Sequence, residues 1–291
     1  MRPYQVAFHS HTVPCLISLR RQSLSGSGTV AAALVGLSTA SNDNIMFTVV
    51  LLAFFISSSY WTKYQARAKA RLDPCYAKAS RRDWKQVLCN GGVGAVISVV
   101  YQYNFDGRRP ADMSLEERKL MTLLIWGYIG FYSCCAADTW ASELGTLSSD
   151  WPVLITTLKQ VPPGTNGGVS KLGMLASFAG GALIGLTADV AMWVQYFGAY
   201  KSGALPRIPY NMLGSVFGML GSLIDSLLGA TVQASYAVNK RIASDISANE
   251  LSQVKGAVLV AGRDVLSNNM VNVVASVSTM AIAIILQTVV F

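Results

Sequence analysis

Charged residues are scarce in this chain of 291 residues, because Asp, Glu, Lys and Arg make up only 13% of it. A soluble domain carries about 25%. The mean hydropathy is +0.40, and the few charges are segregated, which leaves long apolar runs without any. These runs cover residues 45–61, 86–105, 120–137, 172–188, 208–224 and 271–291. Each has about 17 residues or more, enough for a helix to cross about 30 Å of hydrocarbon.

The scarcity of charge excludes an ordinary soluble domain and predicts an all-α fold. We expect a polytopic helical membrane protein with about six to eight transmembrane helices and glycine-rich packing. Residues 1–291 are expected to form a single integral membrane domain. The run 24–40, rich in Gly, Ser and Ala, predicts a short helix packed inside the bundle. The alternating runs of about ten residues that are typical of membrane β-barrels are lacking.

Cysteine and histidine are also rare, with five cysteines and two histidines in the chain. The number of cysteines is odd, and no two of them form a CxxC pair. The pattern therefore indicates neither a disulfide framework nor a zinc site.

The charges that are present are mainly basic, and the net charge is +8. No basic segment interleaves aromatic residues in a recognisable nucleic-acid module, so we expect no nucleic-acid partner. If successive apolar runs cross the membrane in alternating directions, 16 of the 23 lysines and arginines lie on one side of it. Eight of these lie in the segment 62–85, which is predicted to be a basic amphipathic loop at the membrane surface. The bias predicts a cytoplasmic location for this side, in an endomembrane such as the endoplasmic reticulum rather than a plastid.

The same side receives a polar segment, 138–171, that follows an apolar run. It begins with DTWASELG (138–145), in which Asp138 and Glu143 are candidate ligands for a divalent cation, since Mg²⁺ favours hard oxygen donors. The alternative interpretation is that Asp138 caps a following helix.

Further along this segment, Lys159 precedes VPPGTNGG (161–168). Glycines permit backbone conformations that direct N–H groups at an anion, and Lys159 would add a positive charge. A simple turn between helices is the alternative. The predicted phosphate-binding residues of the loop are Gly164, Thr165, Asn166, Gly167 and Gly168.

Asp225 lies on a stripe of glycines within 214–230, spaced so that they share one helix face. The glycines indicate close packing, whereas a carboxylate on such a stripe needs a cation, a partner or a proton. Alternating topology brings Asp225 to the same side as Asp138. Further polar residues on this side are Asn90, Asn268, Asn269 and Asn272. We expect capping by one of the last three, and hydrogen bonds from the others to a ligand or to Asp225.

Several motifs resemble those of the domain-of-unknown-function 92 family, and two of them are most similar to its animal branch, transmembrane protein 19. The resemblance runs in family order from about residue 16 to the C-terminus. It rests on RDWKQVLCNGGVG (82–94), SCCAADTWASELGTLSS (133–149), LITTLKQVPPGTNGGVS (154–170), GSLIDSLLGATVQ (221–233) and NNMVNVVAS (268–276).

The resemblance implies a membrane enzyme of lipid phosphate chemistry, because the plant and cyanobacterial branch is known for phytyl-phosphate kinase activity. A weaker similarity extends to membrane lipid kinases and cytidylyltransferases that use CTP. The implied function is an isoprenyl monophosphate kinase, a transferase that uses CTP or another nucleoside triphosphate with Mg²⁺. Catalysis is then expected from Asp138, Lys159 and Asp225 around one cavity, with metal held by Asp138, Glu143 and Asp225. Asn90, Asn269 and Asn272 join the loop in binding the nucleotide.

Two other functions remain open on the residues alone. Asp189 and Asp225 are predicted to line the path if the protein is an ion or small-solute transporter. A non-catalytic membrane protein is the third interpretation. The expected partners are the lipid bilayer and a prenyl-phosphate lipid, and the oligomeric state does not follow from the sequence.

Overall fold

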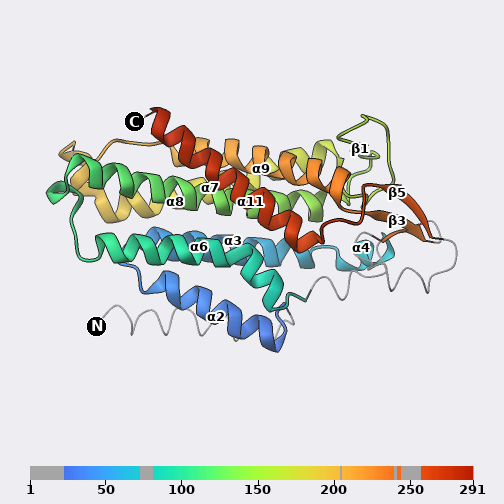
Figure 1. Ribbon diagram of the computed structural model, residues 1–291, viewed down its shortest axis with the longest axis horizontal. Helices are drawn as coiled ribbons and strands as arrows, with labels where there is room; N and C mark the ends of the chain where they lie inside the picture. Colours follow the sequence, from blue (N-terminus) through green and yellow to red (C-terminus); the bar gives the residue numbers. More distant parts are fainter. Residues whose placement is uncertain (1–22, 73–80, 204, 239–240, 244–256, 291) are drawn as a thin grey trace.

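A computed structural model describes residues 23–72, 81–203, 205–238, 241–243 and 257–290. The described chain is mainly helical (Figure 1). The longer helices are α2 (Gly26–Ala40), α3 (Ile45–Lys63), α6 (Trp84–Phe105), α7 (Leu115–Gly145), α8 (Lys171–Lys201), α9 (Tyr210–Val232) and α11 (Asn268–Val290). The short elements are α4 (Ala66–Leu72), η1 (Pro110–Asp112), β1 (Val153–Leu154), β2 (Gly168–Val169), β3 (Ser235–Val238), β4 (Arg241–Ala243) and β5 (Val258–Ala261).

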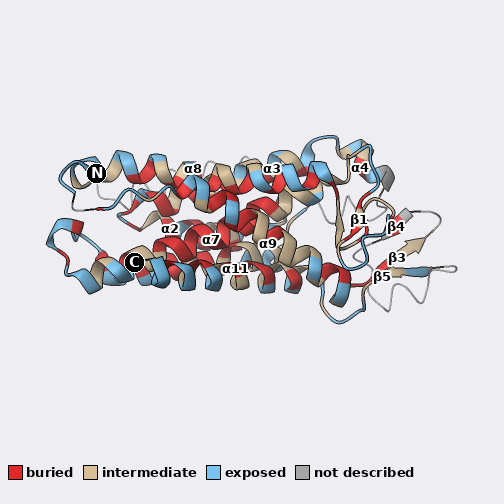
Figure 2. Ribbon diagram, turned by 90° about the horizontal axis from the view of Figure 1, so that it is seen from above, coloured by how far each residue is buried: buried red, intermediate tan, exposed pale blue. Residues whose placement is uncertain are grey.

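Helix α7 is the centre of the bundle, with α3, α6, α8, α9 and α11 packed around it (Figure 2). Every residue from Ile125 to Ala137 is buried, as expected for a helix that is apolar on all faces. Tyr128 packs edge-on against Phe47 of α3, and its hydroxyl donates a hydrogen bond to the Phe47 carbonyl at 2.6 Å. The core therefore forms around α7.

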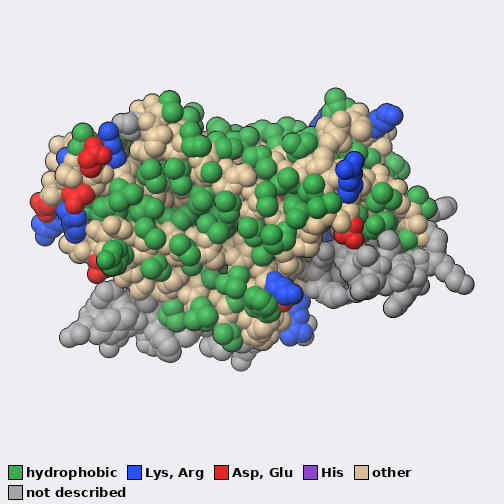
Figure 3. All heavy atoms as spheres, viewed as in Figure 1, with side chains coloured by type: hydrophobic (Ala, Val, Ile, Leu, Met, Phe, Trp, Pro, Cys, Tyr) green, Lys and Arg blue, Asp and Glu red, His purple; other side chains and the backbone are tan. Residues whose placement is uncertain are grey.

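Five helices are long and apolar enough to cross a membrane: α3, α7, α8, α9 and α11. The 22-residue α6 and the 15-residue α2 lie beside them. Figure 3 shows hydrophobic side chains over the middle of one face, with most charges toward the two ends. The all-α membrane fold predicted from the sequence is confirmed.

Glycines bring α8 and α9 into backbone contact. A Cβ added to Gly181 would overlap the carbonyl of Gly214, and one added to Gly185 would overlap the carbonyl of Tyr210. Gly218 likewise faces Gly181 and Ala137. Small residues allow such approach in membrane bundles, and the predicted packing role of the glycine stripe is confirmed.

The helices alternate in direction, and this assigns the connections to two ends. One end holds α4, the antiparallel pair β1–β2 and the sheet β4–β3–β5, at the right of Figure 1. The described parts of the segments 63–84, 145–171 and 232–268 therefore meet at this end, hereafter the strand end. The opposite end holds the α2–α3, α6–α7 and α8–α9 connections. This arrangement matches the alternation predicted from the apolar runs.

One helix boundary and the position of one helix differ from the prediction. Helix α7 continues to Gly145, so Asp138 and Glu143 lie within its last turns and do not open a loop. Their carboxylates face the cavity inside the bundle, so the helix can continue past these polar residues without leaving the bundle. Helix α2 lies at the edge of the bundle, because Val30 and Leu34 on its outer face are each 64% exposed.

Candidate functional site

A cavity of about 410 Å³ lies at the strand end. It is bounded by α2, α3, α6, α7, α8, α9 and α11 and by the loop that joins α7 to α8. One part of its wall is apolar and comes from α2, α3 and α6. The other part is polar and comes from α7, the loop, α9 and α11. Five charged residues line the cavity: Lys69, Arg82, Asp138, Glu143 and Asp225.

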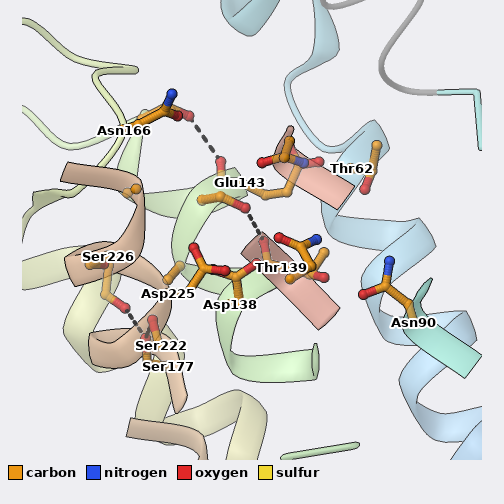
Figure 4. Close-up of a pocket in the computed structure, with 18 of the residues that line it drawn as sticks. Thr62, Asn90, Asp138, Thr139, Glu143, Asn166, Ser177, Ser222, Asp225 and Ser226 are labelled. Atoms are coloured by element: carbon orange, nitrogen blue, oxygen red, sulfur yellow. Dashed lines mark hydrogen bonds between the residues drawn. The ribbon is translucent and has the colours of Figure 1, made fainter. Parts of the chain in front are cut away.

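Asp138 and Asp225 form a carboxylate pair across α7 and α9. Their side chains point toward each other (Figure 4) and lie within hydrogen-bond reach. With its amide turned so that the nitrogen faces acceptors, Asn272 Nδ2 lies 3.3 Å from Asp225 Oδ2. In the described part of the chain neither aspartate forms an ion pair with a basic residue. In that orientation Asn272 makes the contact to Asp225 that was one of the two alternatives for the asparagine cluster.

Glu143 has a different partner. Its Oε2 lies 2.7 Å from Nζ of Lys69, whose side chain is only 3% exposed. Lys69 Nζ also donates to the Trp61 carbonyl at 2.6 Å. Within the described residues, no three Asp, Glu, His or Cys side chains are close enough to hold one metal ion. The three carboxylates predicted as metal ligands are therefore not brought together: Glu143 pairs with a lysine, whereas Asp138 and Asp225 are adjacent.

The aspartate pair fits a magnesium ion. Mg²⁺ in nucleotide sites is bound by one or two carboxylates, with water and phosphate oxygens completing its shell. Two adjacent carboxylates without a basic counterion repel each other unless a cation or a proton lies between them. Asp138 and Asp225 are the residues that would hold the ion.

The loop 161–168 is built as a tight double turn. Gly164 and Gly167 adopt φ values of +88° and +75°, which favour glycine. Thr165 N–H donates to Pro162 O at 3.2 Å, and Gly168 N–H donates to Thr165 O at 2.9 Å. Strand pairing of Leu154 with Gly168 holds the end of the loop.

The loop is also fixed to neighbouring elements. Asn166 donates through its backbone N–H to Ser235 Oγ at 2.9 Å and through its side chain to Ala234 O at 3.1 Å. Gly167 lies against the backbone of Ser226, the residue after Asp225. The loop and the aspartate pair therefore share one cavity, as predicted.

The loop is less open to an anion than its composition suggested. Thr165, Asn166 and Gly168 use their N–H groups within the protein, so only those of Gly164 and Gly167 make no hydrogen bond to a described acceptor. All five predicted residues from 164 to 168 nevertheless line the cavity. The predicted amide cradle is thereby reduced to two backbone donors.

Of the remaining predicted residues, three line the cavity and one does not. Asn90, Asn269 and Asn272 line the cavity, and Asn90 donates to Gln86 O at 3.0 Å. Lys159 does not line it; its side chain is exposed in the turn that follows β1. The prediction that Lys159 faces the same cavity is therefore wrong, because the β1–β2 pairing directs that turn outward.

Two basic residues of the cavity were not predicted as site residues. Lys69 and Arg82 belong to the segment 62–85, which was interpreted as a surface loop. Burial lowers the pKa of the Arg82 guanidinium, and the nearby Glu143 carboxylate raises it. A guanidinium remains protonated despite such shifts. The available signal was that Arg82 begins the family-like motif 82–94 and directly precedes the Asp83 N-cap of α6.

Asp189 does not line this cavity. Its two oxygens accept hydrogen bonds from the backbone N–H groups of Tyr210 and Asn211, each at 2.9 Å. It thus caps the first turn of α9 at the end opposite the strand end. The predicted transport path through Asp189 and Asp225 has no support from this arrangement.

Comparison with known proteins gives a family match over most of the chain. The family model described as "Integral membrane protein DUF92" matches residues 11–280. "Protein PGR" of Arabidopsis thaliana is 38% identical over 269 residues, covering 90% of this chain and 88% of that protein. An uncharacterised membrane protein of Methanocaldococcus jannaschii is 26% identical over 261 residues, covering 87% and 92%. "Protein VTE6, chloroplastic" of A. thaliana is 25% identical over 210 residues, covering 72% and 56%. No solved structure matches.

Proposed function

The chain belongs to the integral membrane protein DUF92 family, and from this premise we propose that it is a membrane-embedded lipid phosphotransferase. The reaction is phosphorylation of an isoprenyl monophosphate by a nucleoside triphosphate. One observation carries the proposal: a single cavity joins an aspartate pair, which has no basic counterion among the described residues, to an apolar wall from α2, α3 and α6. A metal–triphosphate fits the first feature and a prenyl chain fits the second.

The proposed reaction transfers one phosphoryl group. An oxygen of the prenyl monophosphate forms a bond to the γ-phosphorus, and the bond from that phosphorus to the β–γ bridging oxygen breaks. The products are a prenyl diphosphate and a nucleoside diphosphate. Positioning and charge neutralisation supply most of the catalysis in such transfers. Asp138 and Asp225 would hold Mg²⁺, which would neutralise the phosphate charges.

Other residues of the chain have positioning roles in the proposal. Asn272 orients the Asp225 carboxylate through its 3.3 Å contact. The N–H groups of Gly164 and Gly167 are free for phosphate oxygens, and the hydrogen bonds of Asn166 hold the loop against α9 and β3. We further propose that the strand end faces the cytosol, where nucleoside triphosphates are available, in an endomembrane such as the endoplasmic reticulum.

The test uses purified protein in nanodiscs with prenyl monophosphates, labelled ATP or CTP, and Mg²⁺. We expect transfer by the wild type and a loss of about 100-fold or more in Asp138→Asn and Asp225→Asn, because each loses a negative charge at the metal. Asp150→Asn is the matched control, since Asp150 is exposed and lies outside the cavity. A wild type that transfers nothing, or aspartate variants with full activity, would contradict the proposal.

A further inference from the structure

The Arg82 side chain is a charged group with little compensation. It lines the cavity, and its only side-chain hydrogen bond within the described residues joins Nη1 to Ser59 Oγ at 3.5 Å. It forms no ion pair with a described carboxylate. A charge withdrawn from water is costly unless it is paired. The position therefore favours an anion in the adjacent space.

The backbone of Arg82 is held firmly at the start of α2. Arg82 N–H donates to Ser23 O at 3.1 Å, and Ser25 N–H donates to Arg82 O at 2.9 Å. Gly28 lies directly against the same carbonyl, where a side chain would overlap it. The short helix α2 thus fixes the position from which the guanidinium reaches the cavity.

Lys69 adds a second cation to the same part of the wall. Its ammonium lies 2.7 Å from Glu143, and Glu143 is also close enough to Arg82 to affect it electrostatically. Glu143 therefore balances part of the positive charge of both residues. Gln86 also lines the cavity, and its buried amide oxygen has no hydrogen-bond partner in the described structure. A hydrogen-bond donor, such as a protonated phosphate oxygen or a water molecule, would satisfy this acceptor.

The apolar wall begins beside these cations. Val35 of α2, Leu51 and Phe54 of α3, and Val87 and Gly91 of α6 line it. Ser59, the partner of Arg82, is on α3, and Gly28, which touches Arg82, is on α2. In Figure 4, Thr62 and Asn90 lie across the cavity from Asp138 and Asp225. The two cations therefore adjoin elements that form the apolar wall.

We infer that Arg82 and Lys69 form the subsite for the phosphate of the lipid acceptor, with the hydrocarbon chain along α2, α3 and α6. The inference rests on the proposed function and adds the residues that recognise the acceptor. Arg binds phosphate through two parallel hydrogen bonds, and Lys binds it as a point charge. The terminal phosphate of a nucleotide offers the same chemistry, but it lacks a chain for the apolar wall.

Binding is measured without Mg²⁺ or nucleotide, so that the result is independent of turnover. The probe is labelled geranylgeranyl monophosphate, added to the protein in nanodiscs, with geranylgeraniol as the probe that lacks phosphate. We expect Arg82→Gln to weaken monophosphate binding at least about tenfold. The double variant Lys69→Met/Glu143→Gln removes a donor but no net charge, and we expect it to weaken binding by less. Arg82→Lys is expected to retain an intermediate affinity. Geranylgeraniol should bind weakly and equally to all variants.

Lys159→Met is the matched control, because it removes an exposed lysine outside the cavity. The double variant removes both members of a buried ion pair and so avoids an unpaired charge. A second arm measures Mg–ATP binding, which the inference predicts to be unchanged in Arg82→Gln. Loss of Mg–ATP binding with intact monophosphate binding would assign the cations to the nucleotide and overturn the inference.

The acceptor-phosphate subsite and the kinase activity can be tested separately. Monophosphate binding that depends on Arg82 in a protein without transfer activity supports the subsite and refutes the kinase. An active wild type whose KM for monophosphate is unchanged in Arg82→Gln supports the kinase and refutes the subsite. Wild-type protein that binds the monophosphate no better than the alcohol also refutes the subsite.

Discussion

Carboxylates in the membrane helices of this protein differ in what neutralises them, and this decides their roles. Asp189 is satisfied by two backbone N–H groups of α9. Glu143 is satisfied by Lys69. Asp138 and Asp225 have each other and Asn272. Among these carboxylates, Asp138 and Asp225 are the two whose described partners leave negative charge uncompensated, and this makes them the candidates for holding a cation.

The ion pair of Lys69 and Glu143 yields a prediction about stability. Glu143→Gln leaves the Lys69 ammonium buried at 3% exposure without its anion, which costs about 3 kcal/mol in comparable pairs. We expect its melting temperature to fall well below that of the wild type in nanodiscs. The double variant Lys69→Met/Glu143→Gln should recover most of the loss. Equal melting temperatures for wild type and Glu143→Gln would show that the pair is not structural.

Among the elements, α8 and α9 are joined by glycines and not by large side chains. Their backbones meet at Gly181 and Gly214, and the Ser177 and Ser222 hydroxyls share a hydrogen bond of 2.9 Å one to two turns nearer the cavity. This contact holds α9, which carries Asp225, against α8. The contact between α8 and α9 therefore helps to position Asp225 in the site.

Substitution of one glycine tests that support. Gly181→Ala places a methyl group against the Gly214 carbonyl, and overpacking of this kind costs about 1–3 kcal/mol. We expect a lower melting temperature and reduced activity. Gly198→Ala in the same helix is the control, because a Cβ there meets nothing within 4 Å. A Gly181→Ala variant as stable and active as Gly198→Ala would contradict this account of the packing.

The elements themselves follow from the chain, whereas some of their limits do not. Charge-free runs predict α3, α7, α8, α9 and α11. The run 120–137 ends at Asp138, yet α7 extends from Leu115 to Gly145. The capping box of Ser114 and Glu117 starts the helix, and the cavity accepts its polar last turns. Hydropathy alone does not distinguish a polar residue in water from one that faces an internal cavity.

For the whole molecule, the alternation of helices separates two polar ends. The strand end holds the cavity and the other end holds the Asp189 cap. The bias of basic residues predicts that the strand end faces the cytosol. The alternating fold therefore predicts that the two ends lie on opposite sides of the membrane, which labelling can test.

Cysteines introduced at the two ends provide that test, in a background where Cys15, Cys75 and Cys89 are replaced by serine and only the buried Cys134 and Cys135 remain. Ser149→Cys and Ser202→Cys both place the thiol at an exposed position. In sealed vesicles with a known orientation, a membrane-impermeant maleimide should label Ser149→Cys from the cytosolic side and Ser202→Cys only from the other. Labelling of both from one side would refute the alternating topology.

The sequence by itself determined the membrane class, the alternation of helices and the family, because each depends on runs of residues and local motifs. It also indicated Asp138 and Asp225 through their unusual surroundings. Only the tertiary structure decided which charges meet. Lys159 lies outside the cavity, while Lys69 and Arg82 line it and Glu143 binds a lysine. The reason is physical: a side chain's partner depends on how distant helices and turns pack, which local patterns do not record.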